Sequence, residues 1–228
     1  MLFRILLSGS LALLLVSCQH SRIDPSSNLV VKQVQIPDDM PWYSQFAVHS
    51  YIEYQPTPDQ SWSRIEIIYE TSGIRHYEIT DKELHSPSRW GESVRIVAQK
   101  KENGPKLANE IASFARSYPD ANRYVAWPGP NSNTFAEKLL RQTRASAHLD
   151  HNAVGKDYGW YLGRTAGGTG LEVQSPYLGL AAGMTEGIEL HFIGLTAGVG
   201  IWPPAIKLPF ISRLPPRASL GEKASLPE

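Results

Sequence analysis

The sequence predicts an α+β domain, made mainly of antiparallel sheet with a few helices. Residues 42–54 are rich in aromatic and β-branched side chains that alternate with the period of a strand. Residues 64–69 and 74–79 have a similar composition, and the short loop between them favours an antiparallel hairpin. By contrast, the apolar residues of 106–118 recur at helical spacing.

The length of 228 residues favours one substantial domain. We expect a signal peptide over 1–18, a tether over 19–39 with a short strand at 29–36, a single domain over 40–210 and a disordered tail over 211–228. The chain has 22 basic and 22 acidic residues, so no net charge attracts nucleic acid, and we expect no nucleic-acid partner.

The amino terminus has the pattern of an export signal with a lipid anchor. Arg4 precedes an apolar run at 5–16, which is shorter than the roughly 20 residues of a membrane span. Leu15-Val16-Ser17-Cys18 resembles the bacterial lipobox, and Cys18 is the one cysteine of the chain. The resemblance implies acylation of Cys18, and Gln19 in place of Asp implies the periplasmic face of the outer membrane.

The centre of the chain contains its most distinctive segment, the turn at residues 127–135. We expect strands at 94–100 and 124–127, followed by a rigid turn with Pro128 and Pro130 and a helix that runs to about residue 147. Thr134 and Glu137 fit a capping box. The structural interpretation is a well-capped buried helix. The functional interpretation is that the helix N-terminus binds an anion or an oxyanion.

The sequence after this helix predicts strands at 171–174, 187–193 and 195–201. His148 and His151 could share a helical face, but a helix end also favours histidine, and no third ligand is apparent. We therefore expect no metal site and no cofactor. His191 is interpreted as a partly buried strand histidine.

The turn resembles the bacterial family called domain of unknown function 3750. Further residues that carry the resemblance are Val154-Gly155-Lys156-Asp157-Tyr158 and the segment at 203–209. The residues of this signature that we regard as candidates for ligand binding are Asn131, Asn133, Thr134, Trp127, Lys156 and Asp157.

A more distant resemblance is to circularly permuted papain-like proteins of the NlpC type, in which a strand histidine precedes a nucleophile at a helix start. It implies His49 as base and Ser132 as nucleophile, where the family has cysteine. It also implies a third polar residue on the following strands, for which Arg64, Glu66 and His76 stay open. A serine hydroxyl is far less acidic than a thiol, so this departure favours a degenerate site.

Three functions follow as hypotheses. The first is a lipid-anchored envelope protein that binds a cell-wall or lipid-derived ligand in a papain-like cleft without catalysis. The second is an active hydrolase or acyltransferase that uses Ser132 and His49. The third is a structural accessory lipoprotein. The membrane is the expected partner through Cys18, and peptidoglycan or an envelope protein is the further candidate.

Overall fold

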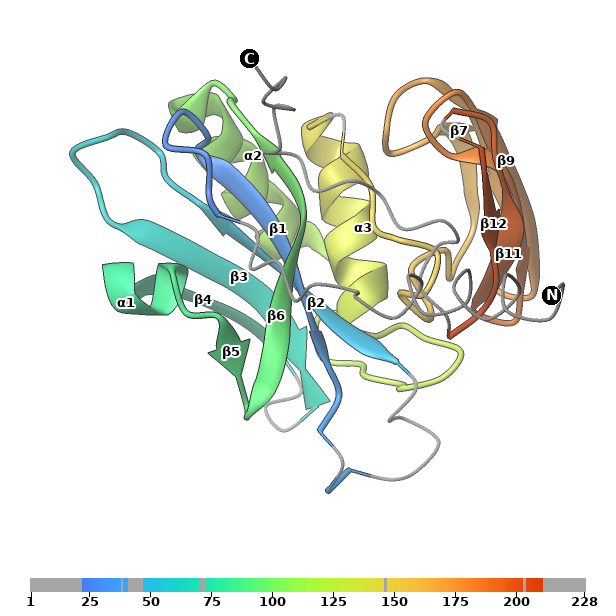
Figure 1. The fold of residues 1–228 in the computed structure, drawn as a ribbon, viewed down its shortest axis with the longest axis horizontal. Helices are drawn as coiled ribbons and strands as arrows, with labels where there is room; N and C mark the ends of the chain where they lie inside the picture. Colours follow the sequence, from blue (N-terminus) through green and yellow to red (C-terminus); the bar gives the residue numbers. More distant parts are fainter. Residues whose placement is uncertain are drawn as a thin grey trace, which may run out of the picture.

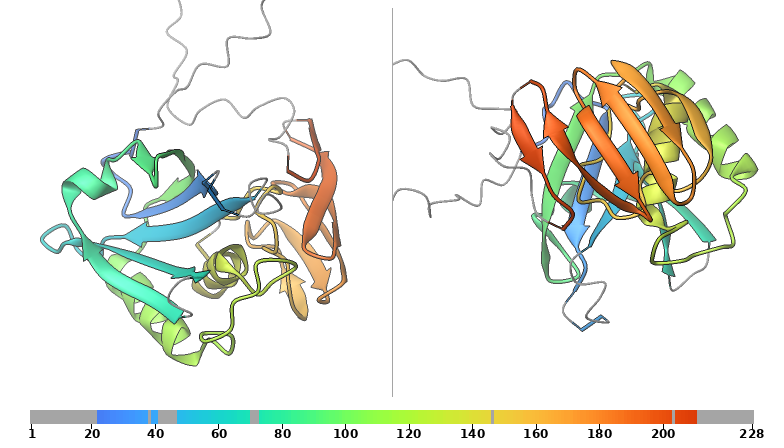
Figure 2. Two further views of the ribbon diagram at one scale, coloured as in Figure 1. Left: turned by 90° about the horizontal axis from the view of Figure 1, so that it is seen from below. Right: turned by 90° about the vertical axis from the view of Figure 1, so that its right-hand side faces the viewer.

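The computed structural model describes residues 22–37, 39–40, 47–69, 73–145, 147–202 and 204–210. It confirms an α+β fold made mainly of antiparallel sheet. Two six-stranded sheets lie on either side of helix α3 (Ser132–Thr143), as Figures 1 and 2 show. No helix within the described ranges is long and apolar enough to cross a membrane.

The first sheet has the strand order β4-β3-β2-β1-β6-β5. Its strands are β1 (Leu29–Gln35), β2 (Val48–Tyr54), β3 (Trp62–Ile68), β4 (Gly73–Ile79), β5 (Ser88–Arg89) and β6 (Glu92–Lys100), and the short helix α1 (Asp81–Leu84) follows β4. β1 pairs with both β2 and β6, so it is an interior strand. The folded domain therefore includes residues assigned to the tether, because the apolar residues of 29–34 complete the core.

One face of this sheet packs against α3 and α2 (Gly104–Ser117). Val48, Ile52 and Tyr54 of β2 belong to this core together with Phe135 and Leu139 of α3. Because successive strand residues point to opposite faces, His49, Tyr51 and Glu53 point away from the helices. A second set of buried side chains, largely charged, occupies that opposite face.

Helix α3 begins and ends earlier than its sequence suggests. Asn131 is the N-cap and Thr134 is the third helical residue of the capping box, so Glu137 lies beyond it. The helix stops at Thr143, because Arg144 adopts a left-handed conformation with φ of 52°. Residues 124–127 do not form the expected strand; Val125 instead donates to the carbonyl of Pro130 across the turn.

The second sheet is an antiparallel meander with the order β12-β11-β10-β9-β8-β7. Its strands are β7 (Tyr161–Arg164), β8 (Gly170–Gln174), β9 (Leu178–Gly183), β10 (Gly187–Phe192), β11 (Leu195–Gly200) and β12 (Ala205–Lys207). β8, β10 and β11 match predicted strands. β7, β9 and β12 did not stand out, because β7 and β12 are short and β9 is rich in glycine and alanine.

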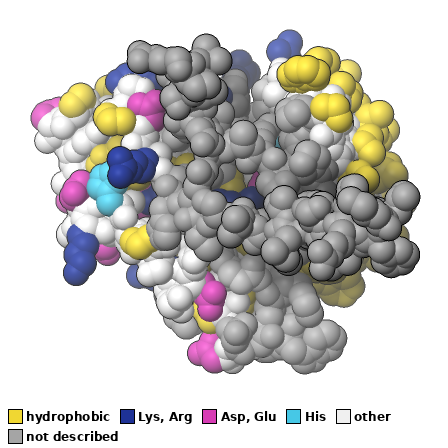
Figure 3. Space-filling model, in the orientation of Figure 1, with side chains coloured by type: hydrophobic (Ala, Val, Ile, Leu, Met, Phe, Trp, Pro, Cys, Tyr) yellow, Lys and Arg dark blue, Asp and Glu magenta, His cyan; other side chains and the backbone are white. Residues whose placement is uncertain are grey.

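The two faces of the second sheet are inverted relative to an ordinary half-buried sheet. In β10, Glu189 and His191 are buried, while Ile188, Leu190 and Phe192 are exposed. The polar face meets α3 and the loop before β7, and the apolar face points outward. Figure 3 shows hydrophobic side chains along the right-hand edge of the molecule, where this sheet lies.

Candidate functional site

The turn at residues 127–135 is held by hydrogen bonds within the protein. The Asn131 carboxamide accepts from the backbone N–H groups of Asn133 and Thr134 and donates to the carbonyls of Ala126 and Val154. The Asn133 amide donates to the carbonyls of Val48 and Val154 at 2.9 Å each. These contacts join the helix start to β2 and to the loop before β7.

The other turn candidates differ in their surroundings. The Thr134 hydroxyl donates to the Gly155 carbonyl at 2.6 Å and is buried. Trp127 is 54% exposed. Gly155 has φ of +82°, and a Cβ there would come within 2.5 Å of the Asn131 amide nitrogen, so this family-signature glycine permits the close approach of the two segments.

Ser132 lies at the first turn of α3 and is buried. Its hydroxyl and its backbone N–H are hydrogen bonded to the phenol oxygen of Tyr124. Burial raises the pKa of Tyr124, and these two hydrogen bonds oppose the increase. The phenol of Tyr124 therefore takes the place at the N-terminus of α3 where an anion would bind.

His49 is fully buried on the face of the first sheet that points away from α3. Its Nε2 lies 2.8 Å from Glu66 Oε2, and its ring packs against Tyr51 and Trp90. Burial lowers the pKa of His49, opposed by the Glu66 carboxylate. The alternation of β2 explains the placement: the Val48 side chain belongs to the core that packs against α3, so its neighbour His49 points the other way.

The three open candidates for a third residue have separate partners. Glu66 is the one that contacts His49, and it also accepts a bidentate pair of hydrogen bonds from Arg89 at 2.7 and 2.8 Å. Burial opposes ionisation of Glu66, but His49 and Arg89 hold its pKa well below the usual range. Arg64 pairs with Glu53, and His76 with the hydroxyl of Tyr54.

A pocket of about 430 Å³ lies beside His49. Its lining is largely apolar and aromatic and includes Ile68, Tyr69, Trp90 and Tyr124. Tyr124 therefore connects this pocket to Ser132, although Ser132 does not line it.

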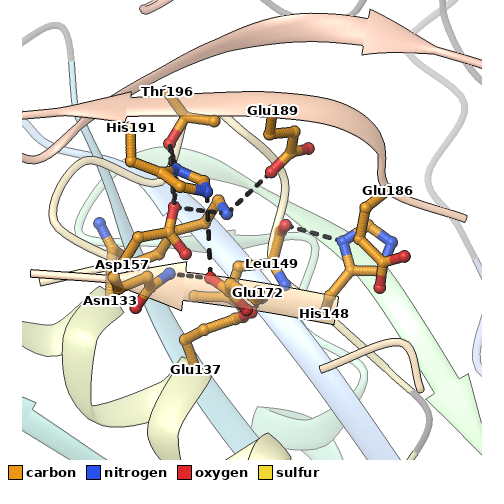
Figure 4. Close-up of polar contacts among 12 residues, drawn as sticks. Asn133, Glu137, His148, Leu149, Asp157, Glu172, Glu186, Glu189, His191 and Thr196 are labelled. Carbon is orange, nitrogen blue, oxygen red and sulfur yellow. Dashed lines mark hydrogen bonds and ion pairs between the residues drawn. The ribbon is translucent and has the colours of Figure 1, made fainter. Parts of the chain in front are cut away.

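Among the described residues, a cluster of buried charges surrounds Asp157, between α3 and the polar face of the second sheet (Figure 4). Asp157 Oδ2 lies 2.6 Å from both Lys156 Nζ and His191 Nδ1 and accepts from Thr196 at 3.0 Å; Oδ1 accepts from Arg141 at 3.1 Å. Burial opposes ionisation of Asp157, but His191 and Lys156 hold its pKa well below its usual range.

The cluster continues along the sheet through Glu189. Its carboxylate pairs with Lys156 at 3.1 Å and with Lys207. Burial opposes ionisation here too, but the two ammonium groups lower the pKa of Glu189 to about 2. Asp157, Glu189 and His191 offer three ligand atoms within 4.8 Å of one another. Because Lys156 and Lys207 already neutralise the carboxylates, the donor set fits a cation poorly.

Glu172 behaves differently from Asp157 and Glu189. It lies 2.9 Å from Arg141 and next to Gln174, and the Nε2 of His191 is 3.9 Å away. Burial and the nearby Asp157 carboxylate outweigh Arg141 and raise the pKa of Glu172 to about 8. Near neutral pH the protonated form of Glu172 is therefore favoured, in contrast to Asp157 and Glu189.

Beside this cluster lies a cleft with a volume of about 970 Å³. The last turns of α3, the loop before β7 and β7 itself form its walls. Four of its lining side chains are cationic and several others are aromatic, and no carboxylate is among its lining residues. The cations are Lys138, Arg141, Arg144 and Arg164, and the aromatic wall includes Tyr158, Trp160 and Tyr161.

The cations of the cleft are not equally available. The Arg141 side chain is 6% exposed, stacks over the Tyr161 ring with its guanidinium carbon 4.8 Å from the ring centroid, and is paired with Glu172 and Asp157. Lys138 lies 3.6 Å from Asp120. Arg144 and Arg164 are exposed at the wall. The cleft can therefore attract an anion through its exposed arginines and bind a flat or apolar group against Trp160, which is 82% exposed.

Residues 30–158 match the family described as protein of unknown function (DUF3750). The chain belongs to this family. The match covers the first sheet, both long helices and the turn, and it ends before the second sheet begins. No curated protein and no solved structure matches the chain. The resemblance seen in the turn and in residues 154–158 is thus confirmed as that of a DUF3750 member.

Sequence reasoning identified Lys156 and Asp157 but did not connect them with Arg141, Glu172 and Glu189. Two signals were available: Arg141 is one helical turn after Glu137, and Glu172 and Glu189 alternate with apolar residues on short strands. Their joint burial depends on how the second sheet packs on α3, which single-strand patterns do not specify.

Proposed function

We propose that this DUF3750 member is an envelope lipoprotein that binds an anionic cell-wall or lipid-derived ligand without chemical conversion. The ligand would bind in the 970 Å³ cleft between α3 and β7. The observation that carries the proposal is the lining of this cleft: four cationic side chains, an aromatic wall and no carboxylate among its residues. A phosphate or carboxylate would bind to the exposed arginines, and a sugar ring or acyl segment to the aromatic wall.

The anchor in this proposal is acylated Cys18 at the periplasmic face of the outer membrane. The described chain begins at Arg22, four residues later. A fully extended chain spans at most about 3.6 Å per residue, so the lipid would lie within about 14 Å of Arg22. The bilayer would therefore be close to the domain and to ligands presented at its surface.

A serine-variant papain-like hydrolase or acyltransferase is the competing proposal. The order of a strand histidine followed by a helix-start serine supports it, as does the Glu66–His49 hydrogen bond. The surroundings of the two residues favour ligand binding without catalysis instead, because Ser132 is hydrogen bonded to Tyr124 and His49 is on the face of the sheet away from α3. A base must come within hydrogen-bond reach of the proton it removes.

Calorimetric titration of the mature chain with the substitution Cys18→Ser tests the binding function. We expect saturable, salt-sensitive binding to one of two anionic probes: a soluble peptidoglycan disaccharide-peptide, or vesicles that contain phosphatidic acid. Binding to the first assigns a cell-wall ligand, and binding to the second a lipid-derived one. Neutral chitotriose and phosphatidylcholine vesicles are the matched controls. Equal binding to neutral and anionic probes, or no binding to any, would refute the proposal.

A further inference from the structure

The outward face of the second sheet is a continuous apolar surface. The strand register aligns Leu162, Val173, Leu180, Leu190 and Ala197 in one row across five strands. A neighbouring row runs through Leu171, Ala182, Ile188, Val199 and Ile206 and begins at Arg164. Of the described residues on these two rows, Arg164 is the one that carries a charge; it lies on the edge strand β7, where it also lines the cleft. We call this surface the apolar sheet face.

The exposure of this face is high for core-type residues. Leu162 is 84% exposed and Leu190, at the centre, is 61% exposed. The buried faces of the same strands carry Glu172, Glu189 and His191, so the alternation is regular but inverted. A contiguous apolar patch of this kind indicates an interaction surface.

The size of the face fits a protein interface. Six strands at about 4.8 Å and five residues at about 3.4 Å give a footprint of about 500 Å². Four more exposed apolar side chains flank it: Trp160, Tyr177, Met184 and Trp202. Together they bring the available surface close to the roughly 800 Å² that one partner buries in a standard interface.

The position of the amino terminus argues against the bilayer as the occupant. Arg22 lies in a pocket with Lys32, Leu84 and Ile96, on the face of the first sheet away from α3. The second sheet lies on the other side of α3 (Figures 1 and 2). This step rests on the proposed lipid anchor at Cys18. With that anchor, the bilayer would be near Arg22, and the apolar sheet face would not contact the bilayer.

We propose that the apolar sheet face binds a second copy of this chain, in a face-to-face packing of two second sheets. An isologous contact requires a surface that is complementary to itself, and a flat, nearly uncharged sheet meets that requirement without matching charges. Two such sheets pack about 10 Å apart with strands aligned at about −30°. The result is a β-sandwich of two second sheets, in which the outer face of each sheet is its polar face and packs against α3 of its own chain.

Cross-linking in native membranes tests this dimer with the full-length, anchored protein. Because Cys18 is the one native cysteine and is acylated in this account, Leu190→Cys supplies a single free thiol at the centre of the face. A bismaleimide should convert it to a species of twice the monomer mass. The matched control, Ser113→Cys on exposed α2, should stay monomeric.

A second substitution separates dimerisation from folding. Val173→Lys, added to Leu190→Cys, would bury a charge in the interface and should reduce the dimer by about tenfold or more, while circular dichroism stays unchanged. A product with the mass of another protein would overturn the proposal. Absence of cross-linking would also overturn it. A membrane-impermeant maleimide would then show whether the Leu190→Cys thiol is free in solution or shielded by lipid.

Failure of the anchor and failure of the dimer can be distinguished. Fractionation of the same cells reports membrane attachment independently of cross-linking. The dimer should also form from Leu190→Cys in the Cys18→Ser chain, where no acyl chain is present. Loss of attachment with a retained dimer would contradict the anchor alone, and attachment without a dimer would contradict the interface alone.

Discussion

Replacement of Asp157 by alanine should lower the free energy of unfolding by about 3–5 kcal/mol at pH 7. Asp157 contacts Lys156, His191 and Arg141 within 3.1 Å, and all four residues are buried. Its removal leaves buried cationic side chains with fewer partners, and the loss of charge compensation is the main cost. Urea unfolding of the Cys18→Ser chain measures the loss.

Asp120→Ala is the matched control for this effect. Asp120 also pairs with a cation, Lys138 at 3.6 Å, but with greater solvent exposure. Its removal should cost less than about 1 kcal/mol. If the two alanine variants were equally stable, the cluster around Asp157 would contribute no more than a surface ion pair, and its description as a buried network would be wrong.

Ionisation of Glu172 should lower the free energy of unfolding as pH rises from about 4.5 to about 8. Its carboxyl has a folded-state pKa of about 8, whereas an unfolded glutamate ionises near pH 4.3. In this window the unfolded state has lost the proton that the folded state keeps, so deprotonation favours unfolding. The expected decline is on the order of 3 kcal/mol between pH 5 and pH 8.5.

Glu172→Gln should remove most of this decline, since an amide of the same shape does not titrate. Glu78→Gln, at an exposed position of β4, should leave the decline unchanged. Urea unfolding at pH 5 and pH 8.5 compares the three chains. A Glu172→Gln chain that loses stability with pH as steeply as the wild-type chain would show that Arg141 keeps Glu172 ionised. Asp157 and Glu189 do not affect the window, because their lowered pKa values place their titration below pH 4.5.

The sequence predicts the fold class because hydrophobic period is a local property. The strands around residues 48–79 and both long helices follow directly from it. His49 shows where this reasoning stops. The alternation of β2 divides its residues into two faces, but the face that α3 covers depends on the connection between distant segments. The pairing of His49 with Glu66 rather than Ser132 was therefore not available from the pattern.

The second sheet illustrates a different limit. The alternation of Glu189 and His191 with Ile188 and Leu190 is legible in the sequence, and it normally places the apolar residues inside. Here the charged side chains are inside, because Lys156, Arg141 and Lys207 supply partners from other segments. Tertiary contacts decide which face of a strand is buried, whereas the period of its alternation is set locally. The same inversion creates both the polar cluster beside the cleft and the apolar sheet face.

Charge reversal at the exposed wall of the cleft tests most directly whether an anionic ligand binds there through the cationic side chains. The double substitution Arg144→Glu and Arg164→Glu changes the two exposed arginines of the lining, and Arg116→Glu with Arg123→Glu makes the same change at exposed positions outside it. Titration with whichever anionic probe binds the wild-type chain should show affinity reduced by about tenfold or more for the first pair and unchanged for the second. Equal affinity of the two pairs would contradict binding in the cleft.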